Sequence, residues 1–275
     1  MFLLTRYERS AANPYDHKGH SGNQYRLDAH RRHDREGFCF GGVESMSYGV
    51  YITGVQVGGT PKRDVSFVQV PGRNGDLMID NKRWNNIPIT YHCAIVASFS
   101  ERFDEFKNAL LSRNGYHRLH DSIYPRTYRM AALVDGITPN AFRLNQSGTF
   151  DIVFTCKPQR YDRFDSDWDH DIKQTPYQYW NSSRFTSSPI ITIYGTGSGT
   201  LTVGDRTVDI LNIDEELTLD CDTMNAYRQV GDAPAENKNN DIYAPEFPVL
   251  EPGTNVISWT GDITSITIRP RGWKL

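Results

Sequence analysis

The sequence predicts a mainly β protein with two successive β regions and one packed helix. Aromatic residues make up 12% of the 275 residues, and 22 glycines and 14 prolines accompany them. This composition is typical of strands joined by many turns. Several segments alternate apolar and polar residues, as half-buried strands do, whereas helical periodicity occurs clearly once. The length fits one large domain or two ordinary ones, at roughly 150 residues each.

The first β region extends over residues 37–161. Its strongest strand pattern is the alternation over Ile87–Phe99, and Phe150–Cys156 alternates in the same way. Val65–Phe67 shows a weaker alternation. Tyr48–Val57 and Tyr128–Val134 are further strand candidates because they combine apolar, aromatic and β-branched residues.

One helix is predicted at about residues 99–114. Its apolar residues recur on one face of a 3.6-residue helix: Phe99, Phe103, Phe106 and Leu110. Ser98 followed by Glu101 fits a capping box, with Ser100 as the alternative cap. Gly115 provides the expected end of the helix. A lone amphipathic helix should pack against a sheet.

The second β region is expected at residues 190–275, after a polar and aromatic linker at 162–189 that shows no periodicity. Short strand-like segments follow one another closely in this region, and no helical pattern exceeds one turn. Gly204-Asp205 and Gly261-Asp262 are candidate two-residue turns between strands. Short strands with frequent turns and no helix predict a β-sandwich.

Residues 1–36 differ from the rest because they are rich in charged residues and histidine and nearly lack periodic apolar residues. Such a segment cannot bury enough apolar surface to fold alone. We therefore expect a polar N-terminal arm that is held by a partner surface, with Tyr7, Tyr15, Tyr25, Arg31 and Arg32 as its docking residues.

Charge and hydropathy exclude several classes of protein. A net charge of −3 and an isoelectric point near 6.2 argue against a dedicated nucleic-acid binder. The longest apolar runs have five residues, which is too short for a membrane-spanning segment. The four cysteines lie far apart and mostly in strand-like runs, so we expect them to be buried and reduced.

No motif predicts a catalytic residue, a cofactor or a metal. Gly195–Gly199 resembles part of a dinucleotide fingerprint, but no helix follows, which favours a flexible hairpin loop. Asp165–Asp171 has alternating carboxylates, but it lacks the glycine and the final glutamate of a calcium loop, so a solvated linker is preferred. Histidine pairs at spacing i, i+3, such as His117 and His120, lack a third ligand. The protein is therefore not expected to be an enzyme.

Aromatic residues cluster in the linker at Tyr177, Tyr179 and Trp180. Exposed rings beside a β-sandwich could stack on sugars, although packing between domains explains them as well and is favoured. A carbohydrate-binding β-sandwich module, attached to a host-binding protein, therefore remains the alternative interpretation.

Three stretches together resemble the distal tail (Dit) proteins of long-tailed, non-contractile phages. They are Val70-Pro-Gly-Arg-Asn-Gly-Asp-Leu77 continuing to Tyr91, Phe150–Tyr161, and Phe247–Ile257 followed by Ile266–Trp273. Phe38–Val43, leading into Tyr48–Gly54, is similar to the usual start of the family. The resemblance extends over about residues 37–275, and the combination is more specific than any single piece.

The resemblance implies a ring-forming first domain and a galectin-like C-terminal β-sandwich. Such proteins form a hexameric hub at the tail tip of the virion and are assembled in the host cytoplasm. Their partners are other copies of the same chain, the tail tube protein and the tail-associated hub or receptor-binding proteins. DNA only passes through the lumen, and no cofactor is needed. The N-terminal arm departs from the family pattern, as does the absence of a large carbohydrate-binding insertion.

A charged turn in the first region is the candidate subunit interface. Its residues are Arg73, Asn74, Asp76, Asp80 and Arg83. In a ring, each subunit presents one patch to a different patch on its neighbour, so opposite charges in a turn can set the register. An ordinary hairpin turn explains the same residues equally well.

Overall fold

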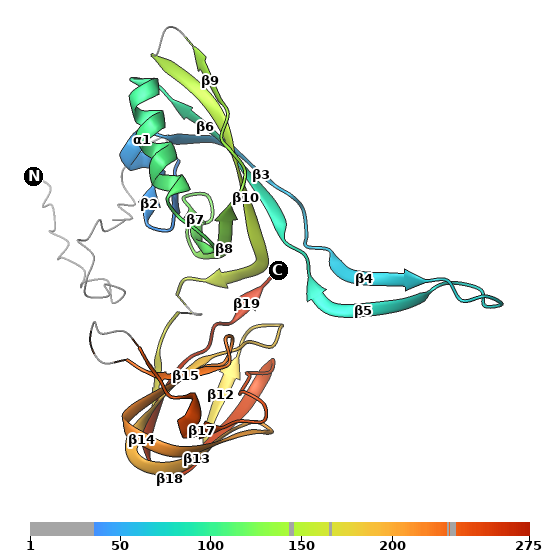
Figure 1. The fold of residues 1–275 in the computed structure, drawn as a ribbon, viewed down its shortest axis with the longest axis vertical. Helices are drawn as coiled ribbons and strands as arrows, with labels where there is room; N and C mark the ends of the chain where they lie inside the picture. Colours follow the sequence, from blue (N-terminus) through green and yellow to red (C-terminus); the bar gives the residue numbers. More distant parts are fainter. Residues whose placement is uncertain (1–35, 143–145, 165–166, 230, 232–234) are drawn as a thin grey trace, which may run out of the picture. The chain divides into compact units, whose positions relative to one another are not determined.

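The structure is a computed structural model that describes residues 36–142, 146–164, 167–229, 231 and 235–275. It is mainly β with one α-helix in the described part, and two antiparallel sheets make up most of it (Figure 1). The mainly β prediction is confirmed. Within the ranges described, no helix is both long enough and apolar enough to cross a membrane.

The first sheet has nine strands. The order is β2-β1-β7-β8-β10-β6-β3, and β9 and β19 also pair with β10. Its strands are β1 (Phe38–Phe40), β2 (Val43–Glu44), β3 (Tyr51–Val57), β6 (Ile87–Ile95), β7 (His117–Asp121), β8 (Thr127–Leu133), β9 (Pro139–Phe142), β10 (Ser147–Asp162) and β19 (Trp273–Lys274). A short 3-10 helix, η1 (Ser45–Tyr48), follows β2. The central pair β6 and β10 includes the two segments with the strongest predicted alternation.

The helix α1 (Phe99–Leu111) lies along this sheet, as Figure 1 shows. The four predicted apolar residues are all buried in the core of the sheet, so the helix and its buried face are confirmed. The helix ends three residues earlier than predicted. The capping box was wrong: Ser98 precedes the helix with a φ of 52° and makes no side-chain cap hydrogen bond. The helix therefore depends on packing of its apolar face more than on its cap.

The second sheet is formed by long strands instead of the short ones predicted. Its order is β11-β18-β13-β14-β15-β16, with β12 pairing to β18 and β17 to β14. The strands are β11 (His170–Ile172), β12 (Tyr177–Asn181), β13 (Ile190–Val203), β14 (Arg206–Asp220), β15 (Asn225–Arg228), β16 (Glu236–Asn237), β17 (Ile242–Tyr243) and β18 (Gly253–Arg269); η2 (Asn239–Asp241) precedes β17. Both halves of β13 and β18 supply buried side chains to one core.

The predicted strands were too short because glycines inside β13 and β18 were interpreted as loops or turns. Gly195–Gly199 is not a hairpin loop, and Gly261-Asp262 is not a turn, because both lie inside continuous strands at shifts of register. A Cβ on Gly195 would lie 2.3 Å from the backbone oxygen of Asp262, so the two strands approach too closely for a side chain. Gly204, in contrast, is in the predicted turn between β13 and β14, with a φ of 62°. The glycines thus allow bulges and bends within the strands.

The structure differs in two places from the division into a linker at 162–189 and a second β region at 190–275. The 162–189 segment is not devoid of regular structure, since β11 and β12 lie within it and pair with β18. The C-terminal strand β19 pairs with β10 of the first sheet, with Tyr161 opposite Trp273. The last strand of the chain therefore belongs to the first sheet.

Candidate functional site

The hairpin of β4 (Arg63–Val68) and β5 (Leu77–Trp84) forms a separate two-stranded sheet. Figure 1 shows it extending away from both main sheets, and the strands pair only with each other among the described elements. A lone two-stranded hairpin is marginally stable in water. This hairpin is therefore expected to gain contacts from another surface.

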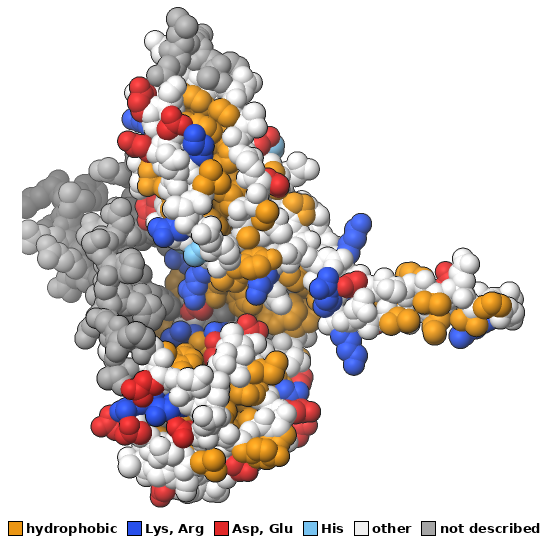
Figure 2. Space-filling model, in the orientation of Figure 1, with side chains coloured by type: hydrophobic (Ala, Val, Ile, Leu, Met, Phe, Trp, Pro, Cys, Tyr) orange, Lys and Arg blue, Asp and Glu red, His pale blue; other side chains and the backbone are white. Residues whose placement is uncertain are grey.

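Both faces of the hairpin carry exposed apolar side chains. Phe67 pairs opposite Met78, and Val68 pairs opposite Leu77. Directly opposed residues share a face, and successive pairs alternate between the faces. Phe67 and Met78 are 62% and 56% exposed, and Val68 and Leu77 are 44% and 42% exposed. Figure 2 shows hydrophobic side chains along the visible face of the hairpin. Neither face covers a core formed by the residues that the structure describes.

Charged groups hold the two strands together near the base of the hairpin. Arg63 pairs with Asp80 and Arg83 with Asp64, each at 2.5 Å, and the Arg63 guanidinium lies 4.8 Å from the centroid of the Trp84 ring. Hydrogen bonds from Asn81 and Arg83 lower the pKa of Asp64. Hydrogen bonds from the Lys82 backbone and from Arg63 lower the pKa of Asp80. All four charged side chains therefore have partners inside the hairpin.

The predicted interface residues fall into two groups in this structure. Arg73, Asn74 and Asp76 lie in the exposed turn between the strands. Asp80 and Arg83 lie on β5 and make the ion pairs just described. The sequence pattern did not indicate that Phe67, Met78 and the other apolar residues of the hairpin are exposed. The weak alternation around Phe67 predicted a strand, but it gave no sign that neither face of this strand covers a core among the described residues.

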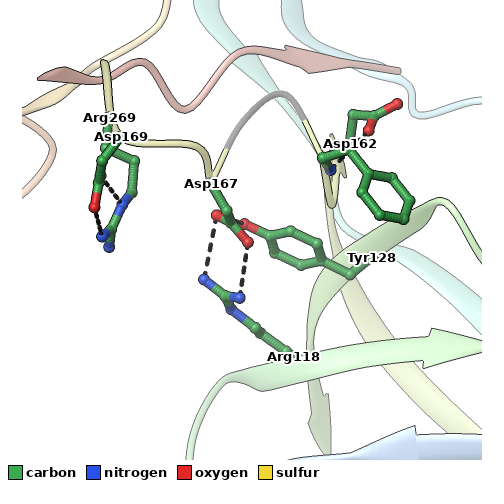
Figure 3. A network of polar contacts seen from close by, with 7 residues as sticks. Arg118, Tyr128, Asp162, Asp167, Asp169 and Arg269 are labelled. Atoms are coloured by element: carbon green, nitrogen blue, oxygen red, sulfur yellow. Dashed lines mark hydrogen bonds and ion pairs between the residues drawn. The ribbon is translucent and has the colours of Figure 1, made fainter. Parts of the chain in front are cut away.

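Two aspartates of the linker, Asp167 and Asp169, each form an ion pair with an arginine (Figure 3). The Asp167 carboxylate accepts hydrogen bonds from both Nη atoms of Arg118, at 2.8 and 3.3 Å, and from the Tyr128 hydroxyl at 2.9 Å. Arg118 also lies over the Tyr128 ring, 4.6 Å from its centroid. The Asp167 side chain is only 12% exposed, so this is a partly desolvated contact of the linker with β7 and β8 of the first sheet.

The next acidic residues of the linker face the second sheet. Asp169 accepts a bidentate pair of hydrogen bonds from Arg269 on β18, at 2.8 and 2.7 Å. Asp171 accepts one from Thr267 at 2.7 Å. The carboxylates of Asp167, Asp169 and Asp171 thus bind side chains of both sheets, while Asp165 lies outside the described residues. In the described part of the chain, no cluster of three or more histidine, cysteine, aspartate or glutamate side chains could hold a metal ion.

The cysteines and the pair His117 and His120 lie where they contribute to the fold and not to a site. All four cysteines are buried and unbridged, as predicted, and burial raises the pKa of Cys93, Cys156 and Cys221 to about 12 each. His117 and His120 lie on strand β7 and not on a helix. Burial, followed by the charges of Arg163 and Arg118, lowers the pKa of His120 to about 4. The docking residues Tyr7, Tyr15, Tyr25, Arg31 and Arg32 lie outside the described residues.

Comparison with solved structures identifies the fold class and then one particular relative. The chain has the two-sheet fold of a phage tail hub protein. The crystal structure of Dit from phage SPP1, described as "a Paradigm of Hub Adsorption Apparatus in Gram-positive Infecting Phages", matches with a TM-score of 0.63 at 12% identity. The match covers 85% of this chain and 97% of the SPP1 chain.

Two structures of the phage p2 baseplate in its activated conformation, one with Sr and one with Ca, also match. Each has a TM-score of 0.47 and 10% identity; they cover 86% and 85% of this chain and 99% and 97% of the matched chain, respectively. No protein-family profile matches the sequence, and no curated protein sequence does.

Proposed function

We propose that the protein is a structural hub at the distal end of a phage tail. Six copies form a ring that joins the tail tube to the host-recognition apparatus and lets DNA pass through its lumen, without enzymatic activity. The observation that carries this proposal is the fold match over nearly the whole length of the SPP1 Dit protein. The proposed location is the virion tail tip, after assembly in the host cytoplasm, and the proposed neighbours are the tail tube protein and receptor-binding proteins.

The β4–β5 hairpin is the proposed ring contact. Its apolar residues are exposed on both faces, which is typical of a surface that becomes covered by another protein. A ring contact joins unlike patches of neighbouring subunits, so a projecting element suits it better than a flat face does. The turn with Arg73, Asn74 and Asp76 then sets the register, while the ion pairs of Asp80 and Arg83 keep the hairpin rigid before assembly.

Negative-stain images and light scattering of the full chain test the ring. We expect pierced rings for the unmodified protein and loss of the rings for Phe67→Asp, because a charge would be buried in an apolar contact. Tyr243→Asp is the matched control, since Tyr243 is 64% exposed and lies on β17, away from the hairpin. Monomers across all concentrations, together with the absence of this protein from images of whole tails, would refute the hub function. Rings that persist in Phe67→Asp would refute only the hairpin contact.

The N-terminal arm is proposed to dock on a neighbouring subunit or on the next tail component. Deletion of residues 1–36 should leave the thermal melt of the remaining chain unchanged and weaken tail assembly. Each ordered residue costs about 1–2 kcal/mol of backbone entropy, so an arm that becomes ordered needs extensive contacts. Normal assembly of the truncated protein would contradict the docking, and loss of folding would contradict an arm outside the cores.

A further inference from the structure

A cavity of about 550 Å³ lies where the end of β10, strand β12 and strand β19 meet. Its lining includes Arg160, Tyr179, Trp180, Arg184, Trp273 and Lys274. The volume is within the range of small-molecule sites. The lining combines aromatic rings with cations, so the cavity differs from a simple packing defect between apolar side chains.

One indole ring on the cavity is open to a ligand. Trp180 is 68% exposed and stacks on no other ring among the residues described. Trp273, in contrast, stacks on Phe185 with the ring centroids 4.3 Å apart, and its Nε1 donates a hydrogen bond to the Thr186 carbonyl at 3.0 Å. Trp273 is therefore held as a fixed wall, while Trp180 offers a free ring beside it.

Among the described residues, the cationic side chains on the cavity have no aspartate or glutamate partner. Arg160, Arg184 and Lys274 make no ion pair within the described ranges, whereas Arg206, Arg228, Arg269 and Arg271 of the second region are each paired with an acidic residue. The lining contains one carboxylate, that of Asp162. The cationic side chains of the lining, those of Arg160, Arg184 and Lys274, therefore outnumber its acidic side chains.

The Arg160 guanidinium has one N–H group without a partner. Its Nε is buried and has no hydrogen-bond partner, and its Nη2 donates to a main-chain oxygen of the C-terminal residue Leu275 at 3.4 Å. Burial and the positive charge of Arg160 lower the pKa of the nearby Arg129. A buried unpaired guanidinium N–H costs free energy, which a carboxylate or phosphate oxygen would recover.

We propose that this cavity binds an acidic saccharide, that is, a sugar ring that carries a carboxylate or a phosphate group. The apolar face of the ring would stack on the Trp180 indole, and the acidic group would pair with the Arg160 and Arg184 guanidiniums. Arginine presents N–H groups in a planar fork that matches both carboxylate and phosphate. The site lies beside the linker and β19, so it differs from a sugar site on the face of the β-sandwich, and it does not depend on the ring.

Other ligand classes fit the lining less well. A metal cation would be repelled by three cationic side chains around one carboxylate. A polynucleotide needs an extended basic surface, but the chain has a net charge of −3. A neutral sugar would stack on Trp180 but leave the charges of Arg160 and Arg184 without a counter-charge. The carboxylate or phosphate group is therefore what distinguishes the proposed ligand from a neutral sugar.

Ligand-observed NMR and titration calorimetry on the full chain test the proposal. The probes are glucuronate for the carboxylate and glucose-6-phosphate for the phosphate, with glucose and inorganic phosphate as controls. We expect at least one acidic sugar to bind at millimolar concentration or better, and glucose and inorganic phosphate each to bind about tenfold more weakly, a difference of about 1.4 kcal/mol. The acidic sugar that binds more tightly identifies the acidic group.

Variants locate the binding. Trp180→Ala and Arg184→Ala should each weaken binding of the acidic sugar about tenfold. Matched controls are Tyr243→Ala, another exposed aromatic residue, and Lys173→Ala, another exposed cation, which should leave binding unchanged. Both test side chains are exposed, so the variants should fold normally, and thermal melts verify this.

Three results would overturn the proposal. The first is no binding of either acidic sugar at about 10 mM, a concentration that detects even weak sites. The second is binding that both variants leave unchanged. The third is binding of an acidic peptide such as Glu-Phe-Glu that glucuronate and glucose-6-phosphate do not displace, because the cavity would then be a docking site for a protein. None of these results bears on ring formation.

Discussion

The cores of the two regions are built from different side chains. The first core contains seven phenylalanines and Tyr91, and its rings touch one another, with 4.9 Å between the centroids of Phe40 and Phe154. The second core consists almost entirely of isoleucine, leucine and valine, and Trp259 is the only buried aromatic residue in that cluster. In the first region large rings fill the space between a helix and a sheet, whereas in the second branched aliphatic side chains of the strands form the core.

Aromatic residues of the second region lie mainly at the surface. Tyr177, Trp180, Tyr194 and Tyr243 are all exposed. A fold that stabilises its core without rings leaves its aromatic residues available for contacts with ligands or partners. The same residue types therefore fill the core in the first region and lie mainly at the surface in the second.

The largest expected effect is the loss of a ring from the first core. Phe154 is fully buried and packs against Phe38, Phe40 and Tyr91. Phe154→Ala should lower the free energy of unfolding of the first region by about 3–5 kcal/mol. Hydrogen exchange of β10 amides measures this, and exchange of amides in the middle of β13 should change much less. The reciprocal variant Ile193→Ala should reverse the pattern. Equal acceleration in both sheets would show that the two cores unfold as one unit.

A smaller effect is expected where the strands of the second region touch. Gly195→Ala places a Cβ against the backbone oxygen of Asp262 and should cost about 1–3 kcal/mol. Gly204→Ala is the control, because its Cβ meets open space and the cost is about 1 kcal/mol for a positive φ. Chemical denaturation compares the two. Equal costs would mean that the bulge of β13 adjusts to a side chain.

The sequence predicted the elements that depend on residues close together in the chain. It did not predict features that depend on contacts with residues far away in the chain. The α1 face and the alternation of β6 and β10 depend on residues close in sequence, so they were predictable. The length of β13 was not, because the reason for Gly195 is a strand about seventy residues later.

The candidate sites show the same limit. The turn at Arg73 could be predicted as a turn, but the exposure of Phe67 follows from the lack of a covering strand among the described elements. The partners of Asp167 and Asp169 come from three separate strands, and the cations of the cavity come from β10, β19 and the segment after β12. The spacing of residues in the sequence does not predict contacts between residues of strands that lie far apart along the chain.

The linker contact should have a moderate effect. Asp167→Asn removes the charge that Arg118 and Tyr128 share, and we expect a loss of about 1 kcal/mol, since the Arg118 side chain is itself half exposed. Glu246→Gln is the matched control and should leave the free energy of unfolding unchanged, because the Glu246 side chain in its pair with Arg206 is 72% exposed. Urea denaturation measures both variants. A double-mutant cycle with Arg118→Gln that gives no coupling would show that the linker pair is not a stabilising contact.

The smallest expected effect is a pH dependence at the edge of the second core. Burial opposes ionisation of Asp220, but hydrogen bonds from Arg271 and its charge, together with the backbone N–H groups of Asp222 and Thr223, outweigh it and lower the pKa. An acid whose pKa is lower when folded stabilises the protein above its unfolded pKa, about 3.9, and loses that contribution as the pH falls through its folded pKa.

Thermal melts between neutral and strongly acidic pH test this contribution. Asp220→Asn should lower the melting temperature at neutral pH and make its decline in acid shallower than in the unmodified protein, because the titrating group has been removed. Asp205→Asn, in the exposed turn after β13, is the control and should keep the original slope. If Asp220→Asn kept the full acid dependence, then other carboxylates, and not the pair with Arg271, would set the acid limit of the second region.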